Sequence, residues 1–153
     1  VDMTVDTMAR LFELKNIIGV KDATGNLDRV NLQKEKMGND FMQLTGEDGN
    51  VLEFNKRGGV GCISVTANIA PKLCSDMHNS WKNNEVDKAL EINLKLAKIH
   101  HALFVETSPG PVKFAAELLD LCLSDTRLPL APIKETTKNL VRNSMIEAGL
   151  ISQ

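Results

Sequence analysis

The sequence predicts an α/β fold whose first half alternates strands and helices and whose second half is helical. Short apolar runs rich in β-branched residues recur about every twenty residues as far as residue 66, and a helix pattern follows each one. After residue 84 only helix patterns occur. Strands that alternate with helices pair in parallel, because each helix carries the chain back across the sheet.

A helix precedes the first strand. Thr4 is a candidate N-cap for a helix over residues 5–14, whose apolar side chains share one face. An apolar strand is predicted at residues 17–21 and is followed by a turn. A second helix then extends from about Leu27 to Gly38, where glycine ends it.

The strand-helix pattern occurs twice more. A strand at residues 41–45 leads through a turn into a short helix that ends at Gly58. A third strand is predicted at residues 60–66, and the helix after it starts near Pro71 and extends towards Trp81.

Helices fill the rest of the chain. Asn84 is a candidate N-cap for a long helix that reaches about residue 105 and carries two apolar stripes, so it needs two neighbours. Two prolines interrupt it, and further helices are expected at residues 112–123 and 134–148.

Three parallel strands cannot close into a barrel, and their edges would normally be paired or covered. A complete (β/α)₈ barrel needs ~250 residues. We therefore interpret residues 1–82 as the last three βα units of an incomplete TIM (β/α)₈ barrel and residues 83–153 as a three-helix carboxyl-terminal region. The chain opens at Val1 without a methionine, so we expect it to belong to something longer.

Lys21 is the candidate catalytic residue. It ends the apolar run of the first strand, and α/β folds place their chemistry at the carboxyl ends of parallel strands. An amine held there against apolar walls has its charged form disfavoured, and only a neutral amine attacks a carbonyl. Lys21 is therefore a candidate Schiff-base former. The alternative is a lysine that ends a strand and extends into solvent.

Composition and charge exclude several classes of function. A net charge of −2 without a basic stripe offers no positively charged surface for binding nucleic acid or an anionic membrane. No apolar run approaches the ~20 residues of a membrane span and no segment resembles a signal peptide, so we expect a cytoplasmic protein. Three widely spaced cysteines, Cys62, Cys74 and Cys122, favour reduced core residues. His100 and His101 point apart on a helix, so no metal site is expected.

Four motifs resemble the second half of the dihydrodipicolinate synthases, which belong to the pyruvate-dependent class I aldolase family that includes N-acetylneuraminate lyase. They are GVKDATGNLDRV at residues 19–30, GGVGCISVTANIAP at 58–71, GPVKFAAELL at 110–119 and LPLAPI at 128–133. The resemblance covers essentially the whole chain. The lysine followed by an acidic residue and Ala-Thr-Gly-Asn favours the synthase branch over the lyase branch.

The resemblance implies a homotetrameric TIM-barrel lyase of lysine and diaminopimelate biosynthesis. Pyruvate would form an imine with Lys21, and the derived enamine would attack L-aspartate 4-semialdehyde. The protonated imine is the electron sink, so no metal or organic cofactor is implied.

The resemblance also assigns roles to other positions. Ile63 matches a residue that lines the pyruvate pocket, although a barrel-core residue would fit its spacing equally well. Gly46 matches a glycine that leaves room for substrate, and the alternative is an ordinary turn glycine. Leu27 and Arg57 match positions near the weaker subunit interface, although Arg57 could equally be solvated.

The sequence also departs from the family. This sequence contains no tyrosine, and thus not the family's tyrosine proton relay. The resemblance implies that the relay, a Thr-Thr-Gly-Glu loop, the substrate-carboxylate arginine and the lysine-feedback site would lie upstream of Val1. We therefore expect the chain by itself to be inactive. Ser108 precedes Pro109 where the family often has asparagine.

Two other functions remain open at this point. The first is another 2-oxo-acid aldolase of the same family, similar to N-acetylneuraminate lyase. The second is a non-catalytic fragment or scaffold, which the missing relay and the unclosed sheet favour.

Overall fold

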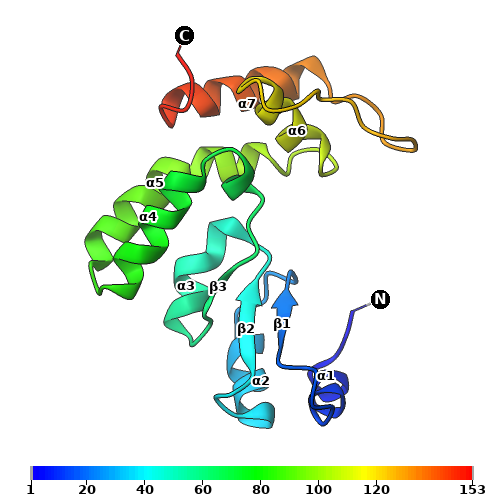
Figure 1. Cartoon of the computed structure of the whole chain (residues 1–153), viewed down its shortest axis with the longest axis vertical. Coiled ribbons are helices and arrows are strands. Elements are labelled where there is room, and N and C mark those ends of the chain that lie inside the picture. Colours follow the sequence, from blue (N-terminus) through cyan, green and yellow to red (C-terminus); the bar gives the residue numbers. More distant parts are fainter. Residues whose placement is uncertain (1, 153) are drawn as a thin grey trace. The chain divides into compact units, whose positions relative to one another are not determined.

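The computed structural model describes residues 2–152, which form one compact unit up to Ser64 and a second from Val65 (Figure 1). The elements of the first unit are α1 (Val5–Phe12), β1 (Gly19–Asp22), α2 (Asp28–Met37), β2 (Met42–Thr45), the 3₁₀ helix η1 (Asp48–Asn50), α3 (Val51–Lys56) and β3 (Gly61–Cys62). Those of the second are the 3₁₀ helix η2 (Thr66–Asn68), α4 (Pro71–Lys82), α5 (Val86–Ala102), α6 (Gly110–Glu117) and α7 (Glu135–Glu147).

The sheet of the first unit is parallel, and its strands lie in chain order β1-β2-β3. Lys21 of β1 pairs with Leu44 of β2, which in turn pairs with Gly61 of β3. The predicted succession of strand and helix with parallel pairing is thus confirmed for the described residues.

All three strands are shorter than predicted, and β2 starts one residue late, at Met42. β1 was expected at residues 17–21 but starts at Gly19, which pairs with the first residue of β2. β3 was expected at 60–66 but comprises only Gly61–Cys62. The amides of Val60 and Ile63 extend its ladder with bonds of 2.9 Å to β2, after which the chain turns into η2. β1 thus starts opposite the first residue of β2, and β3 ends opposite the last.

Two predicted helix caps are confirmed and one is not. The Thr4 hydroxyl accepts the Thr7 amide at 3.2 Å, as expected of an N-cap, and Gly38 ends α2 with φ +79°. The prediction for Asn84 was wrong: its φ is +61°, so it forms a turn, and α5 begins only at Val86.

The helix predicted at residues 112–123 starts and ends earlier than expected. α6 begins at Gly110, includes Pro111 in its first turn and ends at Glu117. Asp120 adopts φ +57°, a left-handed conformation that an α-helix cannot include. The chain continues from there as a loop to α7.

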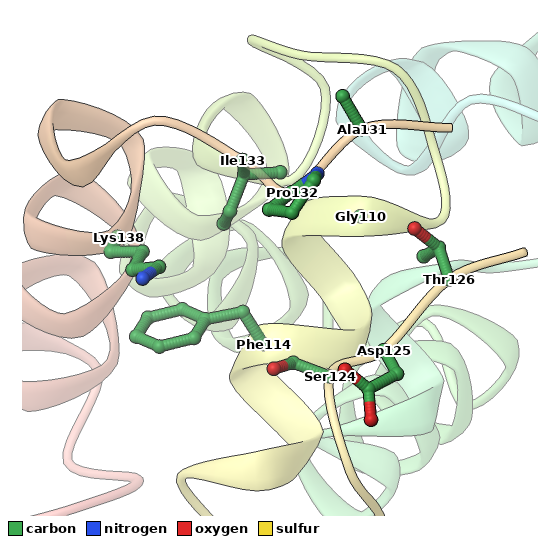
Figure 2. A pocket seen from close by; sticks show the side chains of 9 residues that line it. All are labelled: Gly110, Phe114, Ser124, Asp125, Thr126, Ala131, Pro132, Ile133 and Lys138. Atoms are coloured by element: carbon green, nitrogen blue, oxygen red, sulfur yellow. The ribbon is translucent and has the colours of Figure 1, made fainter. Parts of the chain in front are cut away.

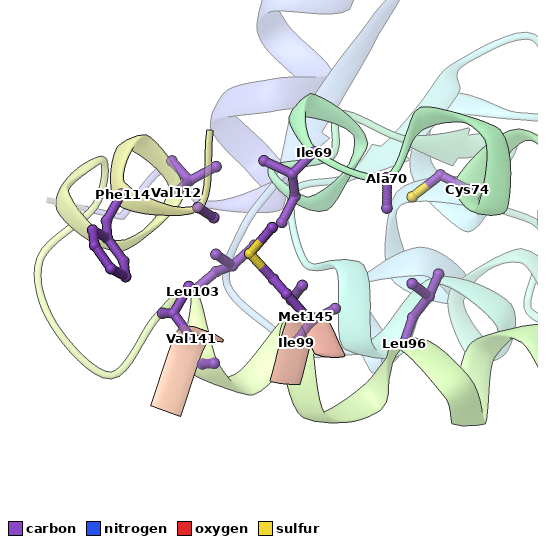
Figure 3. Close-up of a cluster of buried hydrophobic side chains, with 12 residues drawn as sticks. Ile69, Ala70, Cys74, Leu96, Ile99, Leu103, Val112, Phe114, Val141 and Met145 are labelled. Carbon is purple, nitrogen blue, oxygen red and sulfur yellow. The ribbon is translucent and has the colours of Figure 1, made fainter. Parts of the chain in front are cut away.

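The second unit has its own core, built from α4, α5, α6 and α7 (Figure 3). Leu96, Ile99 and Leu103 are fully buried along one side of α5, and Val141 and Met145 of α7 are buried in the same cluster. Of the two predicted apolar stripes on α5, this one is buried.

The other stripe of α5 is exposed in the described structure. Its members Val86, Leu90 and Leu94 are 43%, 44% and 73% exposed. The prediction that both stripes are covered is therefore wrong for the described residues: α4 and α7 lie against α5, but this stripe stays exposed.

A smaller core joins α1 and α2 to the start of β2 in the first unit. Met8, Met37 and Phe41 are buried there. The rings of Phe12 and Phe41 pack edge to face, with centroids 5.1 Å apart and planes at 77°.

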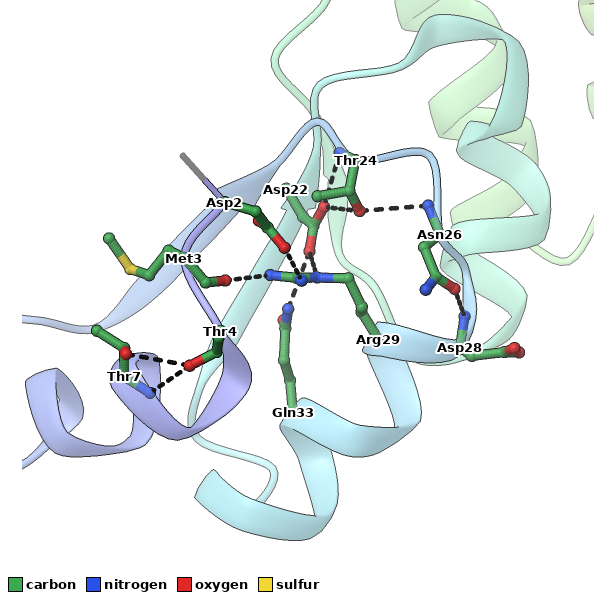
Figure 4. Close-up of polar contacts among 10 residues, drawn as sticks. All are labelled: Asp2, Met3, Thr4, Thr7, Asp22, Thr24, Asn26, Asp28, Arg29 and Gln33. Carbon is green, nitrogen blue, oxygen red and sulfur yellow. Dashed lines mark hydrogen bonds and ion pairs between the residues drawn. The ribbon is translucent and has the colours of Figure 1, made fainter.

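A buried polar network ties the end of β1 to α2 (Figure 4). Asp22 is 6% exposed, and one carboxylate oxygen accepts the amide and the hydroxyl of Thr24 at 2.9 and 2.6 Å. The other oxygen accepts Nε of Arg29 at 2.8 Å and Nε2 of Gln33 at 3.0 Å. Both oxygens therefore have two donors.

Arg29 extends the network to the start of the described chain. Its remaining nitrogens donate to the carboxylate of Asp2 at 2.9 Å and to the carbonyl of Met3 at 2.7 Å. The strand end, α2 and the segment before α1 are thus joined through one guanidinium group (Figure 4).

The network lowers the pKa of Asp22. Burial by itself raises the pKa of this carboxyl group. The hydrogen bonds from Thr24 and Arg29 and the charge of Arg29 together outweigh burial, so the pKa lies below its ordinary value.

We expect Leu96→Ala to lower the free energy of unfolding by about 2–5 kcal/mol, because it leaves a cavity in the core of the second unit. Leu94→Ala makes the same change on the exposed side of α5 and should stay within about 0.5 kcal/mol of the wild type. Urea unfolding followed by circular dichroism measures both. Equal effects of the two substitutions would contradict this account of the core.

Asp22 should make the protein sensitive to acid. Because its pKa is lower in the folded protein than in the unfolded chain, where it is about 3.9, its contribution is complete above that pH and is lost as the pH falls through the folded pKa. Urea midpoints measured from about pH 5 to about pH 2 should therefore fall less steeply for Asp22→Asn than for the wild type.

The matched control for this measurement is Asp6→Asn, which removes the exposed partner of Lys36 in the same unit. We expect this variant to keep the wild-type acid slope. A wild-type slope in Asp22→Asn would show that the carboxylate does not contribute in this way.

Candidate active site

Lys21 is the penultimate residue of β1, at the carboxyl end of the parallel sheet. Successive side chains of a strand point to opposite faces. Because the Asp22 side chain bonds to Arg29 and Gln33 of α2, the side chain of Lys21 projects from the face opposite α2. The position predicted from the sequence, a lysine at a strand end, is confirmed.

The surroundings of Lys21 differ from those expected. An amine between apolar walls was predicted, but Lys21 is exposed. Met42 and Ile63 point to the same face of the sheet and are 45% and 48% exposed. The physical reason is that β1 is an edge strand of the described sheet, and the helix that covers the sheet, α2, lies on the other face.

Gly46 lies directly beside Lys21. Its amide donates to the carbonyl of Asp22 at 2.7 Å, one step beyond the last paired residue of β2. A Cβ atom at this position would lie 2.8 Å from Cε of Lys21 and 2.8 Å from Cβ of Ala23. A side chain at position 46 would thus displace the lysine, so glycine here is more than a turn former.

Ile63 shares the face of the sheet that carries Lys21. Its amide donates to Thr45 at 2.9 Å, which places it just past the end of β3. Its exposure shows that it is not a core residue of the first unit. Contact with pyruvate stays a prediction.

Arg57 contacts the first residue of α2. The guanidinium of Arg57 donates to the carboxylates of Asp28 at 2.8 Å and Glu53 at 3.4 Å, so it lies beside the start of α2, where Leu27 is the N-cap. Their place in a subunit interface also stays a prediction.

The sequence alone did not assign a role to Arg29 or Gln33. They lie four residues apart on α2 and therefore on the same face, next to the buried Val30. Two long polar side chains on the buried face of a helix, after an acidic residue at a strand end, are the signal that indicates such a network.

The second unit contains a cavity of about 140 Å³ between α6 and the segment before α7 (Figure 2). Its lining includes Gly110, Phe114, Ser124, Thr126, Ile133 and Lys138. The amine of Lys138 lies 5.9 Å from the centre of the Phe114 ring and also pairs with Glu135 at 3.1 Å. The charge of this lysine is thus already compensated.

Two kinds of feature are absent from residues 2–152. These residues contain no cluster of three or more His, Cys, Asp or Glu side chains that could hold a metal ion. In the same stretch, no helix combines the length and the apolar character that crossing a membrane requires.

The dihydrodipicolinate synthetase family model matches residues 1–148 of the chain. The 4-hydroxy-tetrahydrodipicolinate synthase of Pelagibacter ubique is 60% identical over 99% of this chain and 53% of its own length. That of Parvibaculum lavamentivorans is 54% identical over 99% of this chain and 52% of its own.

Solved structures of dihydrodipicolinate synthases from other organisms have the same fold as this chain over its described length. The dihydrodipicolinate synthase of Aquifex aeolicus superimposes with a TM-score of 0.93 at 32% identity, over 98% of this chain and 52% of its own. The Acinetobacter baumannii enzyme, solved in complex with pyruvate, gives 0.91 at 38% identity, over 99% of this chain and 52% of its own.

These matches have the same extent. Each takes in nearly all of the chain, while the chain spans about half the length of the curated relatives it matches. Sequence identity, the family model and the three-dimensional fold agree, and the chain belongs to the dihydrodipicolinate synthetase family.

Proposed function

We propose that the protein carrying this chain condenses pyruvate with L-aspartate 4-semialdehyde, as a 4-hydroxy-tetrahydrodipicolinate synthase of lysine and diaminopimelate biosynthesis. The observation that carries this proposal is the position of Lys21 at the carboxyl end of a parallel strand, beside a glycine that leaves room for it. The names of the relatives support the choice of substrates over those of other 2-oxo-acid aldolases.

Lys21 supplies the nucleophile. Its neutral amine attacks the ketone carbon of pyruvate, and loss of water leaves an imine. The protonated imine withdraws electrons, so the methyl group loses a proton and an enamine forms. The enamine carbon attacks the aldehyde of the second substrate. Cyclisation through the amino group of that substrate then releases the heterocycle and restores the lysine.

Gly46 and Ile63 are the proposed substrate contacts. The absence of a side chain at Gly46 keeps open the space next to Cε of Lys21, where the carbon skeleton of pyruvate would lie. Ile63 presents an exposed apolar side chain on the same face of the sheet. It would contact the methyl group of pyruvate.

We propose further that residues 1–82 form the last three βα units of a TIM barrel and residues 83–153 a helical extension. Closing a barrel would cover the face that carries Lys21 and would place the amine between apolar walls. Because the chain contains no tyrosine, a tyrosine relay would have to come from other parts of that barrel. A cytoplasmic homotetramer, with Leu27 and Arg57 near an interface, completes the proposal.

Borohydride reduction in the presence of pyruvate should fix a three-carbon adduct on Lys21, identified by peptide mass spectrometry. Lys21→Arg should give no adduct and lose most activity, because a guanidinium keeps its proton and cannot act as nucleophile. Lys56→Arg makes the same change at a lysine that is 70% exposed in the same unit and should behave as the wild type. An adduct on another lysine in active protein would contradict the assignment.

Gly46→Ala should slow adduct formation by about tenfold or more, because its methyl group must displace the end of Lys21 or Ala23 and small misplacements of reacting groups cost up to ~100-fold. Gly49→Ala, where an added Cβ meets nothing within 4 Å, is the matched control and should keep the wild-type rate. The trapping rate at saturating pyruvate measures both. Equal rates for the two variants would refute the close contact at Gly46.

A further inference from the structure

Asp22, the residue after Lys21, is held through both its side chain and its backbone. Its carboxylate accepts four hydrogen bonds, from Thr24, Arg29 and Gln33. Its backbone carbonyl accepts the amide of Gly46 at 2.7 Å. One residue thus holds the strand end both to α2 behind the sheet and to the glycine beside the lysine.

The backbone at this position needs such support. β1 has a paired neighbour on one side only in the described sheet, and the turn at residues 23–26 begins directly after it. The bond from the Asp22 carboxylate to the Thr24 amide fixes the first step of this turn. The bonds of Asp22 therefore fix the backbone on the carboxyl side of Lys21.

We propose that Asp22 is a positioning residue for Lys21: its bonded carboxylate fixes the strand end so that the amine meets pyruvate beside Gly46. The carboxylate faces α2 and touches no reacting atom. It acts only through the backbone it holds. This inference rests on the proposed function, since it presupposes that Lys21 forms the imine.

Asparagine has the shape of aspartate but cannot replace it here. An ionised carboxylate accepts at both oxygens, whereas an amide has one acceptor and one donor group. In either orientation, the NH₂ group of the substituted side chain would face two of the donors that now bind Asp22. The Thr24 hydroxyl and the Gln33 amide can turn to accept from this NH₂ group, but the Thr24 amide and Arg29 can only donate. Asp22→Asn therefore breaks the bond to one of these two donors without removing volume.

The test is single-turnover trapping by borohydride at saturating pyruvate, in the full protein that carries this chain. Two quantities are measured, the rate constant for adduct formation and the final number of adducts per chain. For Asp22→Asn we expect a rate constant about tenfold to 100-fold below the wild type, with a final stoichiometry that still approaches one. Asp6→Asn should change neither quantity, because Asp6 pairs with Lys36 on the surface.

A purely structural role gives a different result. If Asp22 only stabilises the fold, the variant will contain less folded protein, so fewer adducts form at an unchanged rate constant. That result overturns the positioning role. If the wild type forms no adduct on Lys21, the proposed function fails and the positioning role with it, so the two failures are distinguishable.

The single substitution removes the buried carboxylate partner of Arg29 and leaves only the exposed Asp2, which can prevent folding. The double variant Asp22→Asn/Arg29→Gln removes both charges and carries the same test. We expect it to show the same slow rate constant at full stoichiometry. A wild-type rate constant in the double variant overturns the proposal.

Discussion

The alternation of side chains along β1 is the constraint on which the candidate site depends. Neighbouring residues of a strand point to opposite faces, so an anchor for one residue sets the direction of the next. Asp22 is anchored to α2, which directs Lys21 to the other face of the sheet. A shift of one residue in the pairing with β2 would bury the lysine and expose the aspartate.

The buried charges of the first unit are tolerated because their polar groups are satisfied. Removing an ion from water costs several kcal/mol, about the stabilisation that a good partner can return. All three nitrogens of Arg29 donate, to Asp22, to Asp2 and to the carbonyl of Met3. Exposed pairs such as Lys36 with Asp6 contribute up to about 1 kcal/mol to the free energy of unfolding and do not fix the position of the backbone. The interior pair therefore fixes geometry in a way that the surface pairs do not.

The exposed apolar residues Met42 and Ile63 lie on the face of the sheet that no described helix of the first unit covers. Met42 and Ile63 share this face with Lys21, and a free sheet face with such side chains would be unfavourable in water. In the proposed barrel the same face points inward, where these side chains would surround the amine and desolvate it. The main core of the second unit, in contrast, is already buried by α4 to α7.

The sequence by itself determined the kind and order of the elements, the strand-end position of Lys21, the Thr4 cap and the glycine that ends α2. Each depends on neighbours within a turn or a strand. Only the tertiary structure decided the limits of β1 and β3, the exposure of Lys21 and the partners of Asp22. These depend on strand register and on contacts between residues distant along the chain. Local propensity carries no information about such contacts. The role of Asp22 therefore becomes visible only when Arg29 and Gln33 pack against it.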